Sequence, residues 1–336
     1  MTESPAKNSK AFCNVLAMEK GLDAAGYAGV FETAFALEIP LPWSRALLLD
    51  TDKMPAELTQ IVQIYLDTPP EDRPSFRPLF IAPDDEYSVA GYRRFISYTR
   101  QSGAIATFEQ TEYLMPEADV GKLIWALSQN PDDVSQFSHY IVENDEMRDI
   151  MVCTHGSVDV ACAKFGFPLY RYLRDNLADE KLRVWRVNHF GGHVFAPTLM
   201  DMPKGDYWGF VDEDDARLIV ERNGDLELLR NKYRGCAGLP HGFAQAMERD
   251  ILMQEGWQWQ TYLKQGIILD KDSDEKNPKW ADVRIEYYSQ DNSVSGAYEG
   301  RIFVDKHITT IGSTDADEDY PYPQYVVKNL SHETQK

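Results

Sequence analysis

Along most of the chain, segments in which hydrophobic residues have a helical spacing alternate with segments in which they have a strand-like spacing. Spacings of three to four residues predict amphipathic helices, and short apolar or alternating runs predict strands. The predicted helices lie at 11–29, 55–65, 116–126, 160–177, 213–222 and within 240–264. The predicted strands lie within 30–50 and at 78–82, 104–108, 149–153 and 182–188, followed by a hairpin over 195–211 that turns at 203–206. This alternation of helices and strands predicts an α/β fold.

A polar stretch divides the pattern into two units. Residues 130–146 are rich in acidic and turn-forming residues and predict a linker. We therefore place one α/β unit at 11–130 and a second at 147–255. Beyond them two strand-like runs flank a turn, which predicts a β-rich C-terminal extension over 256–325.

The composition narrows the class of partner. The chain has 336 residues, of which 43% are apolar, and a formal net charge of −20. A protein that binds nucleic acid needs a basic face that displaces counterions, so this charge argues against a nucleic-acid partner and against an anionic membrane. The N-terminal segment has no apolar signal region, and no apolar run is long enough to span a bilayer. We therefore expect a soluble, cytoplasmic protein.

Two of the four cysteines form a pattern with two histidines. Cys153 and Cys162 are spaced as Cys-x8-Cys, and His189 and His193 flank a Gly-Gly pair further along the chain. Cysteine and histidine are ligands of zinc and of iron–sulfur centres. Four cysteines are too few for a disulfide scaffold in a chain of this length, and a reducing compartment disfavours disulfides. The pattern therefore predicts a metal site.

The predicted elements bring these residues to one edge of the second unit. Cys153 ends a strand, Cys162 lies near the start of the next helix, and both histidines follow the next strand. Neighbouring parallel strands end at the same edge, which is where doubly wound sheets hold their sites. Gly191 and Gly192 can adopt torsions that other residues avoid, which allows a tight loop with both imidazoles turned inward. The spacing alone leaves the metal open, because it matches neither a zinc finger nor a Cys-x-x-Cys redox motif.

Longer runs around these residues resemble a known family. The run CTHGSVDVACAKFGFPLYRYLR, followed by HFGGHVFAPT, resembles the sucrase/ferredoxin-like family of thioredoxin-like ferredoxins, whose signature is Cys-x8-Cys and then His-x-Gly-Gly-His. The N-terminal run GYAGVFETAFALEIPLPW is similar to the opening segment of that family. The resemblance covers about 11–240 and leaves the C-terminal extension unmatched.

The resemblance implies two thioredoxin-like units in tandem, the second holding a [2Fe–2S] cluster. Its ligands would be Cys153, Cys162, His189 and His193. Neutral imidazoles in place of two thiolates make such a cluster less negative and raise its reduction potential, as in Rieske centres. A ligating imidazole can also take up a proton on reduction, so we expect the potential to fall as pH rises. The implied protein is an electron carrier or redox sensor without substrate chemistry of its own, and its acidity suits a basic-faced redox partner.

Two other functions stay open at this point. The family description also suggests a glycoside hydrolase, which needs two carboxylates that flank the scissile bond. The abundance of acidic residues guarantees candidate pairs and therefore selects none of them. A binding module with a structural zinc ion would use the same four ligands but would be colourless and without a redox step.

Residues near the motif invite narrower expectations. Asp159 and His155 could hydrogen-bond the cluster or its ligands, although a helix cap and a surface residue are the simpler interpretations. Pro197 lies where thioredoxin-like folds often carry a cis proline, by analogy only. Cys13 and Cys236 are expected to be buried as core thiols.

Overall fold

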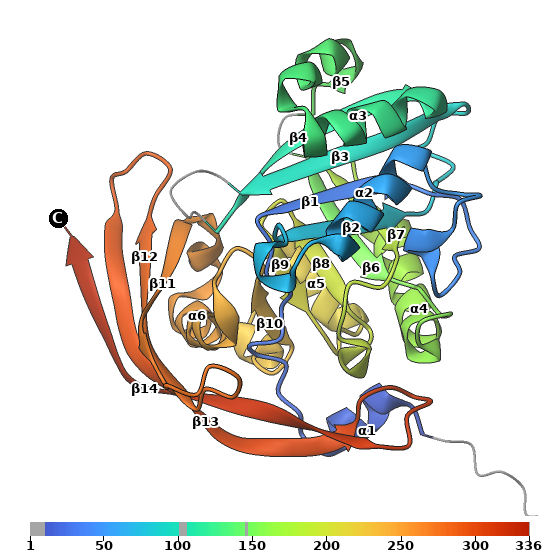
Figure 1. Ribbon diagram of the computed structural model, residues 1–336. Coiled ribbons are helices and arrows are strands. Elements are labelled where there is room, and N and C mark those ends of the chain that lie inside the picture. The colour runs from blue at the N-terminus through green and yellow to red at the C-terminus, as the bar shows by residue number, and fades with distance from the viewer. Residues whose placement is uncertain (1–10, 101–105, 145–146, 336) are drawn as a thin grey trace, which may run out of the picture.

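Strands and helices alternate through residues 11–100, 106–144 and 147–335, which the computed structural model describes (Figure 1). The first part contains α1 (Cys13–Glu19), β1 (Thr33–Glu38), η1 (Leu47–Leu49), α2 (Ala56–Asp67), η2 (Pro70–Asp72), β2 (Phe76–Ile81), β3 (Tyr92–Arg100), β4 (Phe108–Pro116), α3 (Glu117–Gln129), η3 (Pro131–Tyr140) and β5 (Ile141–Val142). The second contains β6 (Arg148–Cys153), α4 (Val160–Asn176), β7 (Leu182–Val187), η4 (His193–Phe195), β8 (Leu199–Met202), β9 (Asp206–Trp208), α5 (Glu213–Glu221), η5 (Leu226–Leu229), β10 (Tyr233–Cys236) and α6 (His241–Glu255). The last contains η6 (Gly256–Thr261), β11 (Leu263–Lys271), β12 (Trp280–Tyr288), β13 (Ser295–Ile311) and β14 (Asp319–Gln335).

One mixed sheet of ten strands joins the first two parts, in the order β10-β9-β8-β6-β7-β2-β1-β3-β4-β5. In the first part β1 pairs in parallel with β2 and antiparallel with β3, and β3 pairs with β4. The second part repeats this order, because β6 pairs in parallel with β7 and antiparallel with β8, and β8 pairs with β9. The two parts meet where Ile81 of β2 pairs with Val187 of β7. The sheet therefore consists of two halves that share the same strand order.

Buried charges hold the middle of this sheet together. The guanidinium of Arg183 on β7 donates to Glu112 on β4 and to Asp149 on β6 over 2.9–3.2 Å. Trp185 and Tyr98 also donate to Asp149. Every member of this network has a partner, as a charge buried in an apolar core requires.

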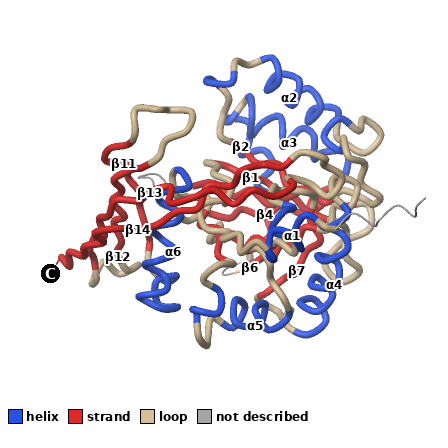
Figure 2. The backbone as a smooth tube through the Cα atoms, turned by 90° about the horizontal axis from the view of Figure 1, so that it is seen from below, coloured by secondary structure: helices blue, strands red, loops and turns tan. Residues whose placement is uncertain are grey.

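A separate antiparallel sheet in the order β11-β12-β13-β14 forms the C-terminal part and confirms that it is rich in strands. Buried and half-buried residues alternate along β12, because one face of this sheet packs against α6 around Trp259, Ile285 and Tyr298. The strands β13 and β14 are longer than β11 and β12, and they run on as a two-stranded ribbon beneath the α/β part as far as α1 (Figures 1 and 2).

Several local expectations are confirmed. The hairpin of β8 and β9 turns at 203–205, and Asp212 caps α5 in a reciprocal capping box with Asp215. The peptide bond between Ala196 and Pro197 is cis, as the analogy suggested. Cys13 and Cys236 are both buried. No helix in the described part of the chain is long and apolar enough to cross a bilayer.

Other expectations are corrected. The helix expected over 11–29 covers only Cys13–Glu19, since the N–H groups of residues 26–28 bond to the carbonyl of Arg234 instead of to a helical turn. The stretch 130–146 contains η3 and β5, which pairs with β4, so it is not simply a linker. The helix within 240–264 ends at Glu255, before η6 and β11. The strand near 104–108 falls partly outside the described residues, and β4 begins at Phe108.

Candidate metal centre

The topology gathers the four candidate ligands at one edge of the sheet. Cys153 is the last residue of β6 and pairs with Val187, the last residue of the parallel strand β7. Cys162 lies in the first turn of α4, which connects these two strands, and His189 and His193 follow β7. Adjacent parallel strands end side by side, so the loops after β6 and β7 must meet.

Three donor atoms converge within this edge. The Nδ1 atom of His189 lies 3.7 Å from the sulfur of Cys153 and 3.7 Å from the sulfur of Cys162. All three donor atoms lie within 4.8 Å of one another. Both thiols are buried and the His189 ring is half-buried, so the group sits just below the surface. Two sulfurs and one imidazole nitrogen at this separation can share a metal group.

The fourth candidate, His193, lies against the first histidine. The two imidazole rings stack with centroids 5.1 Å apart. The Nε2 atom of His193 is 2.6 Å from the carbonyl oxygen of Gly312, and a carbonyl can only accept, so Nε2 carries the proton. The Nδ1 atom therefore presents its lone pair, and it is buried without a partner among the described residues. A buried acceptor without a donor costs free energy, and a metal bound to Nδ1 would remove that cost.

The protonation states of these groups suit metal binding. A hydrogen bond from the Cys162 thiol, opposed by burial and assisted by His189, holds the pKa of Cys153 well below its usual value. The same contact and burial raise the pKa of Cys162. Burial, followed by the proximity of His189, lowers the pKa of His193. A neutral imidazole is the form that binds a metal.

The loop between the histidines depends on its two glycines. Gly191 and Gly192 have φ angles of +99° and +82°, in the region that L side chains rarely adopt. A Cβ on Gly192 would lie 2.4 Å from Nη2 of Arg234, whereas a Cβ on Gly191 would meet nothing within 4 Å. The first glycine is therefore needed for conformation alone, and the second for conformation and for close approach to an arginine.

That arginine was not found from the sequence. Arg234 on β10 is 3% exposed and donates to the carbonyls of Gly191, at 3.2 Å, and of Tyr27. Burial lowers its pKa to about 10, so it stays charged at neutral pH, and Cys153 is among the groups that favour its charge. Among the described residues no carboxylate pairs with it. A buried cation thus lies against the loop that carries both histidines, and nothing in the local pattern of YRGCAG indicates this.

Two neighbours of the motif support the site indirectly. His155 is 4% exposed, so the interpretation as a surface residue is wrong. Its Nδ1 accepts from the backbone N–H of His189 at 3.2 Å, and its Nε2 donates to the carbonyl of Ser44 at 2.9 Å. Asp159 caps α4, because its carboxylate accepts from the N–H of Ala161 at 2.8 Å, which confirms the simpler interpretation for that residue.

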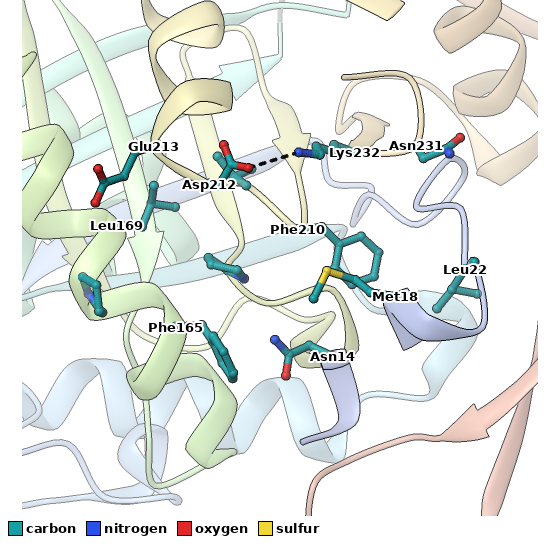
Figure 3. Close-up of a pocket in the computed structure, with 14 residues that line it drawn as sticks. Asn14, Met18, Leu22, Phe165, Leu169, Phe210, Asp212, Glu213, Asn231 and Lys232 are labelled. Carbon is teal, nitrogen blue, oxygen red and sulfur yellow. Dashed lines mark ion pairs between the residues drawn. The ribbon is translucent and has the colours of Figure 1, made fainter. Parts of the chain in front are cut away.

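An apolar cavity of about 480 Å3 lies beside this region, between α1, α4 and the start of α5 (Figure 3). Phe165, Phe210 and Met18 line it, and an ion pair of 3.7 Å joins Asp212 to Lys232 at one end. A glycosidase would need two carboxylates on either side of a bound sugar. The two carboxylates that line this cavity, Asp212 and Glu213, are adjacent in the chain, and Asp212 also caps α5 and pairs with Lys232, so this cavity gives a glycoside hydrolase no support.

Two comparisons with known proteins returned matches to this chain. The sequence profile of the sucrase/ferredoxin-like family matches residues 26–235, which include all four candidate ligands. The chain is also 28% identical over 143 residues to the Altered inheritance of mitochondria protein 32 of Meyerozyma guilliermondii. That match covers 39% of this chain and 50% of the relative, so the chain spans about half the length of the curated relative it matches. No solved structure matches the chain. Because the family profile covers most of the sequence, the chain belongs to the sucrase/ferredoxin-like family.

Proposed function

We propose that this protein binds a [2Fe–2S] cluster and transfers single electrons or senses redox state. The ligands would be Cys153, Cys162, His189 and His193. The observation that carries the proposal is the convergence of two thiols and the His189 imidazole at a single sheet edge, with the ring of His193 stacked on His189 and its buried Nδ1 without a partner among the described residues. When bound, the cluster would accept and release one electron.

The surrounding residues favour a site for electron transfer over a substrate-binding site. Buried thiols and half-buried imidazoles keep the donor set out of bulk water but near the surface. The guanidinium of Arg234, which pairs with no carboxylate among the described residues, favours the more negative, reduced state of a group bound here. The formal net charge of −20 suits docking to a basic redox partner by electrostatic steering. Proton uptake on reduction stays a prediction, which the dependence of the potential on pH tests.

A structural zinc ion is the second candidate, because the 3.7 Å separations also suit the ligands of one tetrahedral ion. Iron, acid-labile sulfide and zinc measured on the full chain purified without oxygen distinguish the two. Visible absorbance with equal iron and sulfide supports the cluster, whereas a colourless protein with one zinc ion overturns it.

Variants test the ligand assignment. We expect His193→Ala to weaken or abolish cluster binding, because it removes the Nδ1 ligand atom, which has no hydrogen-bond partner among the described residues. His307→Ala is the matched control, since His307 lies exposed on β13. Equal visible spectra for both variants would reject the assignment of His193.

A further inference from the structure

The segment that joins β13 to β14 reaches the candidate metal centre although it lies outside the matched family region. The family profile ends at residue 235, whereas this segment starts at residue 312. The two strands carry it beneath the α/β part, where it lies against α1 and η4 (Figures 1 and 2). Residues 312–314, which we call the C-terminal clamp, make the contacts with His193 and Asp159.

The first contact holds a ligand directly. The carbonyl oxygen of Gly312 accepts from Nε2 of His193 at 2.6 Å. This bond selects the tautomer in which Nδ1 is free to ligate, and it fixes the plane of the ring. A hydrogen bond from a ligating imidazole to a carbonyl also raises the basicity of the ligand, and such partners typically change metal affinity 10–100-fold.

The second contact holds the helix that carries another ligand. The N–H of Thr314 donates to one carboxylate oxygen of Asp159 at 2.8 Å, and its hydroxyl donates to the other at 2.7 Å. Asp159 caps α4, and Cys162 follows in the first turn of that helix. Thr314 and Asp159 are 5% and 3% exposed, so water does not compete for these bonds.

The helix α1 closes the arrangement from the other end of the chain. The N–H of Cys13 donates to the hydroxyl oxygen of Thr314 at 3.4 Å, and the thiol lies 3.6 Å from the carbonyl oxygen of His193. The side chain of Asn14 donates to the carbonyl of Ala196 at 2.9 Å, just after η4. Helix α1 and the β13–β14 connection, which are about 300 residues apart in the sequence, therefore meet over the loop that carries the histidines.

We infer that the C-terminal clamp positions the metal ligands: Gly312 orients His193, and Thr314 orients Cys162 through Asp159. This inference rests on the proposed function and assigns a role to the C-terminal sheet that the family region does not include. The strands β13 and β14 of this sheet bring the C-terminal clamp to the site. Removing the clamp would loosen two of the four proposed ligands, His193 and Cys162.

A shortened hairpin tests the inference. Ile311 pairs with Asp319, so residues 312–318 can be replaced by a two-residue Asn-Gly turn that keeps β13 and β14 paired. The matched control makes the same replacement at 289–294, between Tyr288 and Ser295, which pair at the other end of β13. We expect the clamp variant to lose iron to a chelator 10–100-fold faster than wild type and the control variant to lose it at the wild-type rate.

A second measurement needs no metal. Nitrogen NMR of the metal-free protein with labelled histidine reports the tautomer of His193. We expect the Nε2–H form in wild type and in the control, and a mixture of tautomers in the clamp variant. If the shortened hairpin does not fold, Thr314→Val removes the hydroxyl contacts with Asp159 and Cys13 but keeps the N–H bond to Asp159, and it should accelerate iron loss by a smaller factor.

The outcomes separate the two proposals. Wild-type protein with iron and sulfide, together with wild-type iron loss in the clamp variant and in Thr314→Val, overturns the inference and leaves the proposed function intact. Wild-type protein without iron and sulfide overturns the proposed function and with it the role of the clamp in metal binding. An unchanged His193 tautomer in the clamp variant overturns the orienting role of Gly312 in either case.

Discussion

The two glycines between the histidines lead to a prediction about stability. In Gly192→Ala the new Cβ would lie 2.4 Å from Nη2 and 2.7 Å from Cζ of Arg234. The guanidinium cannot easily move, since it donates to the carbonyls of Gly191 and Tyr27 and packs 5.2 Å from the ring of Phe195. The substitution therefore forces the loop, the arginine or both out of place.

The size of the effect follows from two contributions. A non-glycine residue in the left-handed region costs about 1–2 kcal/mol. A buried guanidinium that loses a hydrogen bond to a carbonyl costs about 1.5–3 kcal/mol more. We therefore expect Gly192→Ala to lower the free energy of unfolding by about 2.5–5 kcal/mol and Tm by roughly 4–7 °C. Cluster binding should weaken as well, because His193 is the next residue.

Gly191→Ala is the matched control. Its φ angle is also positive, but the new Cβ would meet nothing within 4 Å, so only the conformational cost of about 1–2 kcal/mol applies. Denaturant unfolding of the metal-free proteins measures both variants without interference from cluster loss. Equal losses in the two variants would refute the argument that contact with Arg234 makes the second glycine necessary.

Three further predictions concern buried charges. Arg183→Met leaves the buried Asp149 without its ion-pair partner, while Glu112 keeps Arg94. We therefore expect the free energy of unfolding, measured with denaturant, to fall by about 3–5 kcal/mol, and a fall of less than about 1 kcal/mol contradicts this. Burial raises the pKa of Asp206 to about 6 from its ordinary value of 3.8, so the folded protein keeps a proton that the unfolded chain has already released. The free energy of unfolding should therefore fall by about 2–3 kcal/mol from this group between about pH 4 and about pH 7, and Asp206→Asn should remove that part of the slope in unfolding curves measured across this range. Arg234→Gln removes a cation beside the proposed cluster, and a unit charge at about 10 Å in an effective dielectric of about 20 contributes about 1.7 kcal/mol, or about 70 mV. Spectroelectrochemistry should show a lower reduction potential, and an unchanged or higher value would contradict the assignment.

Local sequence signals determined the part of the site that depends on near neighbours. The apolar run before Cys153 indicated a strand that ends there, and the structure ends β6 at that residue. Asp159 indicated a helix start, and it caps α4. The Gly-Gly pair indicated a loop with unusual torsions, which both glycines adopt. These features could be predicted because each depends on residues within one or two turns of the chain.

Strand β3 shows where the local pattern fails. The sequence predicts no element between the strands at 78–82 and 104–108, although β3 lies there and contains Arg93 and Arg94. In the fold, Arg94 is 8% exposed and pairs with Glu112 on the neighbouring strand, while its backbone N–H donates to Glu38 at 2.9 Å. A charged residue belongs in a core strand only when a partner from elsewhere in the chain neutralises it, and a single sequence does not reveal that partner.

The sequence by itself determined the α/β class, the four candidate ligands and the edge of the sheet at which they meet. Only the tertiary structure decided what surrounds them: the buried cation of Arg234, and the carbonyl of Gly312 and the side chain of Thr314 on a hairpin more than a hundred residues away. The physical reason is that a ligand's position follows from the strand and helix that carry it. Its tautomer, its orientation and the charge around it follow from contacts that form only when distant segments pack together.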